Sequence, residues 1–313
     1  MNQNNIILMK IKILSVLLVG LVFFSCEKGT KLTKDSKETV VTGTTSILVD
    51  ETIFPIVEDV VAVFENEYKN AKINLISKPE GEILQLVKKD HSKIAILARN
   101  LNKEELQYFS NKKIIPRITE FAEDAVVFIT HKDNAIETVS IDAFSKKLNG
   151  LESQWSQNIV FENPQSSTIS FLKSKLEITQ IDTKKVFSMK DSKELIQFIA
   201  TNKNAVGVVG VNWLLQPPVD LEETVQNVKI LGVSIPAVIE GKSFVKPNQS
   251  NIADHSYPWT RKLYLLNFQG AKGLGMGFAS YIAGENGQRI ILKSGLSPIK
   301  FPSREINVKG SIE

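Results

Sequence analysis

Cysteine and histidine are scarce in this sequence. There is one cysteine, Cys26, and there are three histidines, His91, His131 and His255, in 313 residues. A single cysteine excludes a framework of intrachain disulfides. None of the histidines has a second histidine, a cysteine or a carboxylate at a spacing typical of a metal site. The sequence therefore predicts a protein without a metal ion or another cofactor.

The motifs of common enzyme families are also missing. There is no G-x-S-x-G, the nucleophile turn of α/β-hydrolases. Gly241-Lys242-Ser243 has the form of the end of a phosphate-binding loop, but Pro236 stands where that loop requires its first glycine. Residues 273–277, which alternate glycine with apolar residues, lack the spacing of a dinucleotide fingerprint, and we interpret them as a flexible loop that runs into a helix. The sequence therefore predicts that the protein is not an enzyme.

No apolar run is long enough to cross a membrane. Residues 13–24 form an apolar run of 12 residues, whereas a helical span needs about 20. The run follows Lys10 and Lys12 and is followed by the small residue Ser25 and by Cys26. A basic start, a short apolar stretch and a small residue before the cleavage point are typical of a secretory signal peptide.

The end of the apolar run resembles a relaxed lipobox, in which the cysteine becomes the first mature residue and carries lipid. We therefore predict a signal peptide over residues 1–25, with Met9 as an alternative start, and lipidation of Cys26. Residues 26–42 are interpreted as a lipidated tether, since the segment after Cys26 is polar, charged and without periodicity. The alternative for Cys26 is an ordinary small buried residue.

The predicted mature chain has almost no net charge. Removal of Lys10 and Lys12 with the signal peptide leaves 36 basic residues against 34 acidic ones. This balance does not suggest nucleic-acid binding. The length that remains is enough for roughly two domains, and it allows about 75% of the unfolded surface to be buried.

Short apolar segments alternate with segments of helical spacing along the chain. The predicted strands are residues 46–49, 73–76, 94–97, 114–115, 125–130, 159–161, 205–209, 228–233 and 261–267. The predicted helices are residues 57–68, 83–87, 104–109, 141–148, 167–176, 191–199, 278–282 and 289–292. Residues 214–249 are rich in proline and are predicted to be irregular apart from the strand at 228–233. This alternation predicts an α/β fold with a largely parallel sheet.

One feature is compatible with anion binding. Ser166, Ser167 and Thr168 stand at a predicted helix start, after a turn forced by residues 163–165. The first turn of a helix has unpaired N–H groups and a partial positive charge, and hydroxyls there add donors. The alternative is simple helix capping, for which serine and threonine are the preferred residues. Arg99 directly follows a predicted strand, where a surface ion pair is the alternative to a ligand contact.

Eight segments, taken in order, resemble the family of phosphate-binding proteins that serve phosphate ABC transporters. They are residues 49–55, 94–101, 123–129, 148–155, 166–171, 204–210, 257–264 and 287–298, and they extend over nearly the whole mature chain. Thr52 lies in the segment that is similar to the family's first strand-to-helix turn, and Arg99 in the segment similar to its strand followed by Ser-Arg. Ser166, Ser167 and Thr168 resemble its Ser-Gly-Thr anion loop. The resemblance implies that these five residues bind the ligand.

The resemblance also implies a fold and a role. The fold would be a two-lobed α/β periplasmic binding protein-like fold of type II, with the ligand cleft between lobes that two crossing strands join. The first lobe would comprise residues 43–127 and 263–313, the second residues 128–262, and residues 125–128 and 263–266 would lie side by side as the crossings. The implied ligand is a small anion, inorganic phosphate. The implied partners are the permease subunits of an ABC importer, and the implied location is the periplasm, with a monomer anchored to a membrane by lipid on Cys26.

The sequence departs from the family pattern at several positions. Glu162 stands where the family has an arginine, Ser167 where it has a glycine and Ala98 where it has a serine. Residues 79–82, which contain two glutamates, replace a loop rich in serine and glycine. Carboxylates close to a dianion repel it when solvent is scarce. Two alternatives follow, namely the same fold with a cationic, zwitterionic or protonated ligand, and an envelope assembly lipoprotein without a ligand.

Overall fold

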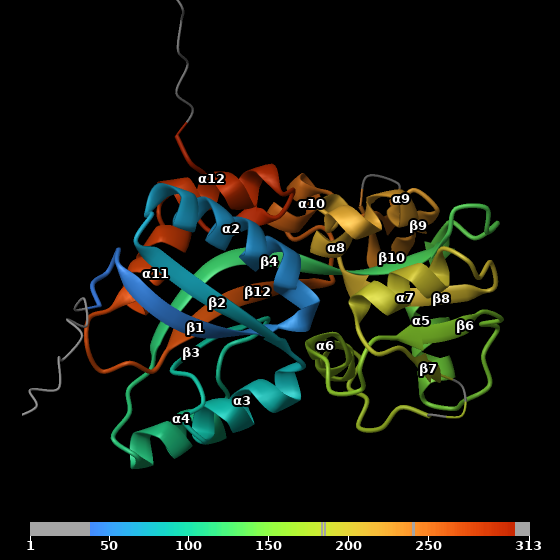
Figure 1. Ribbon diagram of the computed structural model, residues 1–313. Helices are drawn as coiled ribbons and strands as arrows, with labels where there is room; N and C mark the ends of the chain where they lie inside the picture. Colours follow the sequence, from blue (N-terminus) through green and yellow to red (C-terminus); the bar gives the residue numbers. More distant parts are fainter. Residues whose placement is uncertain (1–37, 183, 185, 240–241, 304–313) are drawn as a thin grey trace, which may run out of the picture. The chain divides into compact units, whose positions relative to one another are not determined.

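The computed structural model describes residues 38–182, 184, 186–239 and 242–303 (Figure 1). The predicted signal peptide over residues 1–25, the predicted lipid site at Cys26 and the tether up to residue 37 lie outside the described residues. Within the described part, no helix is both long and apolar enough to cross a membrane.

A mixed sheet forms the centre of the fold, with the strand order β2-β1-β3-β12-β4-β8-β6-β7, and β9 and β13 pair with β4 beside this path. Its strands are β1 (Gly43–Asp50), β2 (Ala71–Lys78), β3 (Ile94–Leu97), β4 (Arg117–His131), β6 (Asn158–Phe161), β7 (Val186–Ser188), β8 (Ala205–Gly210), β9 (Val228–Ile230), β12 (Thr260–Asn267) and β13 (Ser297–Pro298). The outer pairings, β1 with β2 and β3 and β6 with β7 and β8, are parallel. The predicted α/β class is confirmed. The sheet is mixed rather than largely parallel, because β4 and β12 run antiparallel to their neighbours.

We refer to the part built on β1, β2, β3 and β12 as the first lobe and to the part built on β6, β7 and β8 as the second lobe. In the first lobe, neighbouring residues of a strand enter two different cores. Ile47 and Val49 pack with α2 (Phe54–Glu67), α11 (Leu274–Ile282) and α12 (Glu285–Lys293). Leu48 packs with α3 (Glu80–Lys88) and α4 (Lys103–Asn111) on the other face (Figure 1). This alternation is the two-residue period of a strand that is covered on both faces.

The second lobe places helices α5 (Ile141–Leu148), α6 (Ser167–Lys175) and α7 (Ser192–Ile199) around its part of the sheet. All six residues of β8 are buried. A Cβ on Gly207 would lie 2.8 Å from Leu195 Cδ2 and 2.9 Å from Ile199 Cγ1, so α7 packs closely on this strand because the residue is a glycine. Asp191 caps α7 by accepting a hydrogen bond from the Glu194 amide.

The strand β4 belongs to both lobes. Its residues 117–125 pair with β12, and its residues 126–130 pair with β8. The two crossing strands are neighbours, but residues 263–266 pair with residues 118–122 instead of lying beside residues 125–128. The register differs because β4 begins at Arg117, far earlier than the apolar run from which the strand was predicted. Its first residues are exposed or half-buried and include Arg117, Thr119 and Glu120, so the strand starts before the continuous apolar run.

Three further sequence predictions differ from the structure. Residues 114–115 are not a strand, since the strand begins directly after Pro116. The segment 214–249 is more regular than predicted. It supplies two strands, β10 (Gly232–Ile239) and β11 (Lys242–Val245), to a second sheet of order β11-β10-β5, in which β5 (Thr138–Val139) is the third strand. The short helices in or next to the segment are α8 (Asn212–Leu215), η2 (Val219–Leu221), α9 (Glu222–Val225) and α10 (Gln249–Ala253). The third difference is in the glycine run at 273–277, most of which lies inside α11 and is not a loop.

The glycines of α11 allow the N-terminal segment to lie against this helix. A Cβ on Gly277 would lie 1.6 Å from the Val40 carbonyl oxygen, which no side chain could tolerate. The Glu38 carboxylate accepts a hydrogen bond from the Leu274 amide at 2.8 Å, at the first turn of α11. Residues 38–42, which were predicted as the end of a tether, are therefore held on the first lobe.

Candidate functional site

A buried ion pair joins the two crossing strands. Arg261 of β12 donates from Nε and Nη2 to Asp124 Oδ2 of β4, at 3.0 and 2.8 Å. Their side chains are 2% and 0% exposed. A buried ion pair is costly to form and even more costly to break, so its position between the lobes needs a reason beyond stability.

Arg261 also connects hydroxyl groups from both lobes. Its Nη2 donates to Thr52 Oγ1 at 3.0 Å, and its Nη1 donates to Ser167 Oγ at 3.0 Å. The two hydroxyl oxygens are 2.7 Å apart, within hydrogen-bonding distance. Thr52 belongs to η1 (Glu51–Ile53) of the first lobe, whereas Ser167 begins α6 of the second lobe. We refer to Thr52, Ser167, Arg261 and Asp124 as the interlobe cluster.

The backbone around Thr52 is fixed by three neighbours. Asp50 caps η1 by accepting a hydrogen bond from the Thr52 amide at 3.0 Å. Asn212 Nδ2 and Trp213 Nε1 donate to the Thr52 carbonyl oxygen at 3.0 and 3.1 Å. A Cβ on Gly210 would lie 2.7–2.9 Å from Asn212 Nδ2, the Thr52 carbonyl oxygen and Arg261 Nη2. The close approach of β8 to the cluster therefore requires a glycine at position 210.

The interlobe cluster has hydrogen-bond donors beyond those used within it. A guanidinium has five N–H bonds, and four hydrogen bonds from Arg261 are accounted for. Thr52 and Ser167 each accept from Arg261, and one of their two hydroxyl protons is used in the bond between them. The other proton is free for a third acceptor. One N–H of Arg261 and one hydroxyl proton of Thr52 or Ser167 therefore remain to donate to a further acceptor. An oxyanion, which has several lone pairs, is an acceptor of this kind.

The start of α6 adds further donors. The amides of Ser167 and Thr168 lie in its first turn, where no intrahelical acceptor exists. The Thr168 hydroxyl is fully buried and has no hydrogen-bond partner in the described part of the chain. Ser166 behaves differently, because its hydroxyl accepts a hydrogen bond from the Ile169 amide at 3.3 Å. Ser166 therefore caps α6, which is the alternative to a ligand contact given for this residue above.

Two buried glutamates stand close to this arrangement. Glu162, directly after β6, is 0% exposed, and neither of its carboxyl oxygens has a hydrogen-bond partner among the described residues. Burial raises the pKa of Glu162 to about 7, although the nearby Thr168 hydroxyl and Arg261 charge act in the opposite direction. Burial also raises the pKa of Glu51 to about 8, with the charge of Glu162 as the second cause. Both carboxyls can therefore carry a proton near neutral pH.

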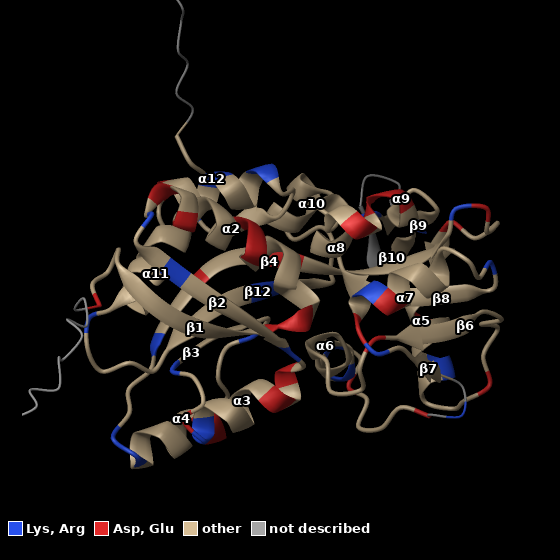
Figure 2. Cartoon of the chain, in the orientation of Figure 1, with Lys and Arg blue, Asp and Glu red and all other residues tan. Residues whose placement is uncertain are grey.

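Arg99 does not join the interlobe cluster. Its Nε donates to Glu80 at 2.7 Å, and its Nη1 and Nη2 donate to Glu105 at 2.8 and 2.9 Å. A further bond runs from Nη1 to the Asn100 carbonyl oxygen. Acidic residues gather at the start of α3, where Glu80 lies (Figure 2). The ion pair that was the alternative for Arg99 is therefore present, and its donors are directed to protein groups.

The structure thus brings Thr52 and Ser167 into contact, keeps Thr168 beside them, uses Ser166 as a cap and places Arg99 in another ion network. Sequence reasoning missed Arg261 as the cation of the site. A signal was present, since Asp124 and Arg261 lie at the edges of the apolar runs in two segments that were expected to lie side by side. Opposite charges on neighbouring buried strands have few partners other than each other.

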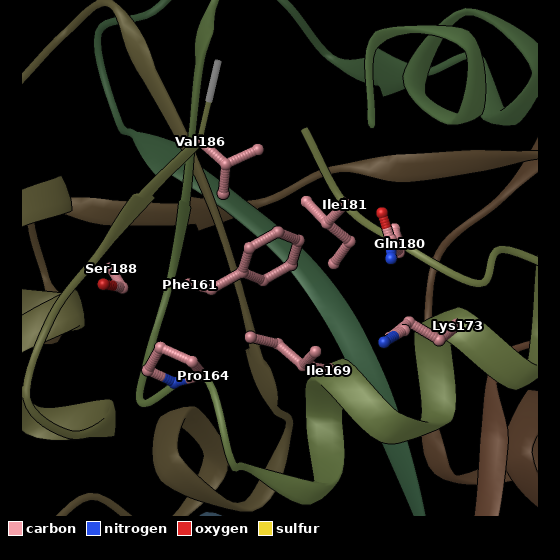
Figure 3. Close-up of a pocket in the computed structure, with 8 residues that line it drawn as sticks. All are labelled: Phe161, Pro164, Ile169, Lys173, Gln180, Ile181, Val186 and Ser188. Carbon is pink, nitrogen blue, oxygen red and sulfur yellow. The ribbon is translucent and has the colours of Figure 1, made fainter. Parts of the chain in front are cut away.

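A separate cavity of about 570 Å³ lies in the second lobe and does not involve the interlobe cluster (Figure 3). Phe161 and Ile169 form part of its apolar wall, together with Ile181 and Val186. Lys173 supplies the positive charge among its lining residues. Gln180 and Ser188 are its other polar lining residues, and Lys173 is the one charged residue among the eight that line it, so this cavity offers little charge to a small, highly charged anion.

Known proteins with similar sequences include phosphate-binding proteins. The phosphate-binding protein PstS of Staphylococcus haemolyticus is 25% identical to this chain over 223 residues, which cover 68% of this chain and 67% of that protein. The phosphate-binding protein PstS of Pseudomonas aeruginosa is 22% identical over 298 residues, which cover 87% of this chain and 88% of that protein.

A solved structure from Clostridium perfringens, described as a phosphate ABC transporter substrate-binding protein with bound phosphate, aligns with a TM-score of 0.67. The sequences are 18% identical, and the alignment covers 82% of this chain and 100% of the other. This likeness agrees with the two-lobed periplasmic binding protein-like fold predicted from the sequence. A family profile described as the PBP superfamily domain matches residues 35–286, well over half of the chain. The chain therefore belongs to the periplasmic binding protein superfamily.

Proposed function

We propose that this protein is an extracytoplasmic solute-binding protein that holds inorganic phosphate between its lobes for an ABC importer. The observation that carries the proposal is the interlobe cluster. Hydroxyls from opposite lobes meet on one buried guanidinium, and beside them lies the Thr168 hydroxyl, which has no hydrogen-bond partner among the described residues. The names of the relatives from Staphylococcus haemolyticus and Pseudomonas aeruginosa agree with phosphate as the solute.

The position of the cluster also suits a protein that closes on its ligand. A ligand can drive closure only if it makes contacts in the closed form that the open form lacks. Thr52 lies on one lobe and Ser167 on the other, so an anion bound to both hydroxyls would stabilise closure. The closed form would then be recognised by permease subunits. Lipid on Cys26 would keep a monomer at the membrane surface, on the periplasmic side.

Calorimetry with inorganic phosphate tests this function on the exported protein kept in detergent. We expect Ser167→Ala and Thr168→Ala to weaken phosphate binding by roughly 10- to 150-fold each, since a hydrogen bond to a charged group contributes about 1.5–3 kcal/mol. Ser174→Ala is the matched control, because Ser174 lies in the same helix with an exposed side chain. Absence of heat and of a thermal shift at millimolar phosphate would remove phosphate as the ligand.

A second function is favoured by the uncompensated acids. Glu162 and Glu51 would match a ligand that carries a positive group better than they match a dianion. The variant Glu162→Gln separates the two functions by the sign of its effect at alkaline pH. It should tighten binding of phosphate by removing a repulsion, whereas it should weaken binding of a cationic or zwitterionic ligand.

A further inference from the structure

The position of Glu162 poses a problem for an anion site. Its side chain is fully buried, and neither carboxyl oxygen has a hydrogen bond of good geometry in the described part of the chain. The hydroxyls of Thr168 and Ser166 are nevertheless close enough to lower the pKa of Glu162. Removing a carboxylate from water is costly, and the usual response of a protein is to keep such a group neutral. Burial outweighs the two hydroxyls and therefore favours the protonated form.

The positive charges near Glu162 are already paired with other carboxylates. The charge of Arg261 lowers the pKa of Glu162, but Arg261 donates hydrogen bonds to Asp124. Arg99 is paired with Glu80 and Glu105. The charged groups that act on the neighbouring Glu51, besides Glu162 itself, are acidic and come from β1, α3 and the cap of α7, namely Asp50, Glu82 and Asp191. An oxyanion placed here beside an ionised Glu162 would meet more negative than positive charge.

We propose that Glu162 is the specificity-determining proton donor of the site: in its neutral form, its O–H donates a hydrogen bond to an oxygen of the bound phosphate. This inference rests on the proposed function, since it assigns a role within the same site. A protonated carboxyl is a donor where a carboxylate is only an acceptor. Glu162 thus replaces a cation by a neutral donor, and Glu51 beside it supplies a second carboxyl that can hold a proton.

The proposal requires phosphate binding to depend on pH. Burial raises the pKa of Glu162 to about 7, so the donor form prevails below this pH and is lost above it. Anion binding stabilises the protonated form, and the complex therefore takes up a proton at higher pH. One proton taken up on binding weakens the measured affinity by about tenfold for each pH unit above the pKa of the free protein.

The decisive comparison is between the wild type and Glu162→Gln, whose amide is a permanent neutral donor. Phosphate also changes its own protonation in this range, but it does so equally for both proteins. The quantity to follow is therefore the ratio of the variant Kd to the wild-type Kd, measured by calorimetry from pH 6 to pH 8. We expect a ratio near one at pH 6 and about one tenth at pH 8. Glu152→Gln, an exposed glutamate of the second lobe, should give a ratio near one throughout.

Two further measurements keep the inference testable without reliance on one variant. Calorimetry of the wild type at pH 8 in buffers of different ionisation enthalpy should reveal uptake of about one proton. NMR of protein with 13C-labelled glutamate carboxyls should show a resonance that titrates near pH 7 in the free wild type and is absent in Glu162→Gln.

A ratio that stays flat with pH, or a Glu162→Gln variant that binds more weakly at every pH, would overturn the donor role while phosphate binding itself stands. If the wild type binds no phosphate at any pH in this range, the proposed function and the donor role both fall. The two failures are therefore distinguishable in the same set of titrations.

Discussion

Removal of the buried Glu162 carboxyl should change how stability depends on pH, whether or not a ligand binds. In the unfolded chain Glu162 has the ordinary glutamate pKa of 4.5, and burial raises its pKa to about 7 in the folded protein. Between these values the folded state binds the proton more tightly than the unfolded state does, so stability falls as pH rises. The contribution is fully present below pH 4.5 and is lost by about pH 7. At 1.36 kcal/mol for each pH unit, the loss amounts to about 3 kcal/mol.

Glu162→Gln cannot ionise and should not show this loss. Urea unfolding in phosphate-free buffer at pH 4, 5, 6, 7 and 8 gives the free energy of unfolding of both proteins. We expect the stability of the variant relative to the wild type to rise by about 3 kcal/mol between pH 4 and pH 7 and to stay level above that. The exposed Glu152→Gln serves as the control and should remain parallel to the wild type. Parallel curves for Glu162→Gln would mean that the carboxyl is solvated or paired in solution, and the reasoning from its burial would be wrong.

The other predictions concern the remaining site and the N-terminus. Arg99→Ala should weaken phosphate binding less than Thr168→Ala does, because the Arg99 donors are taken up by Glu80 and Glu105; calorimetry that ranks them in the opposite order would return Arg99 to the site. Cys26→Ala should abolish labelling by a radioactive fatty acid and release the protein from membranes, and equal labelling of both proteins would refute lipidation. Gly277→Ala should lower the melting temperature, since its Cβ would lie 1.6 Å from the Val40 carbonyl oxygen, and an unchanged melting temperature would show that residues 38–42 do not lie there in solution.

Much of the fold could be predicted because local patterns agree with it. The predicted helix over residues 141–148 is α5 with the same bounds, and its cap Ser140 accepts a hydrogen bond from the Ala143 amide. Patterns failed where the determining contact is distant in sequence. The glycines of α11 looked like a loop because the residues that leave no room for a Cβ there are distant in sequence, namely Val40 at Gly277 and Ile94 at Gly275. The first half of β4 was missed because polar and charged residues occur on both of its faces.

The site divides in the same way. Ser167 was identified from a helix-start pattern and Thr52 from the family resemblance, and their contact is consistent with the cleft that the resemblance implied. The cation was not identified, because Arg99 and Arg261 both follow or begin strands and only the three-dimensional arrangement shows which one is already paired with glutamates. Sequence alone marked Glu162 as an unusual residue. Its lack of partners, from which its protonation follows, required the structure.

The double membership of β4 has a mechanical consequence. Three strands or turns meet at its Ala125–Val126 peptide, where the Val126 amide donates to the Trp259 carbonyl oxygen and the Val211 amide donates to the Ala125 carbonyl oxygen, both at 2.8 Å. Tyr257 Oη adds a bond of 2.8 Å to the Val126 carbonyl oxygen. If the strand bends there, this peptide is the hinge, or fulcrum, of the motion. Residues 126–131 of β4, about 20 Å long at roughly 3.3 Å per residue, would then rotate about it together with the second lobe.

Since Arg261 and Asp124 lie beside this fulcrum, a shift of a fraction of an ångström at the ligand would become several ångströms at the rim of the second lobe. Labels on β2 and β7, at opposite edges of the sheet, would report that displacement as a change in their separation when phosphate is added. A membrane partner that contacts the rim would then detect anion binding through the larger displacement there, without contacting the anion itself.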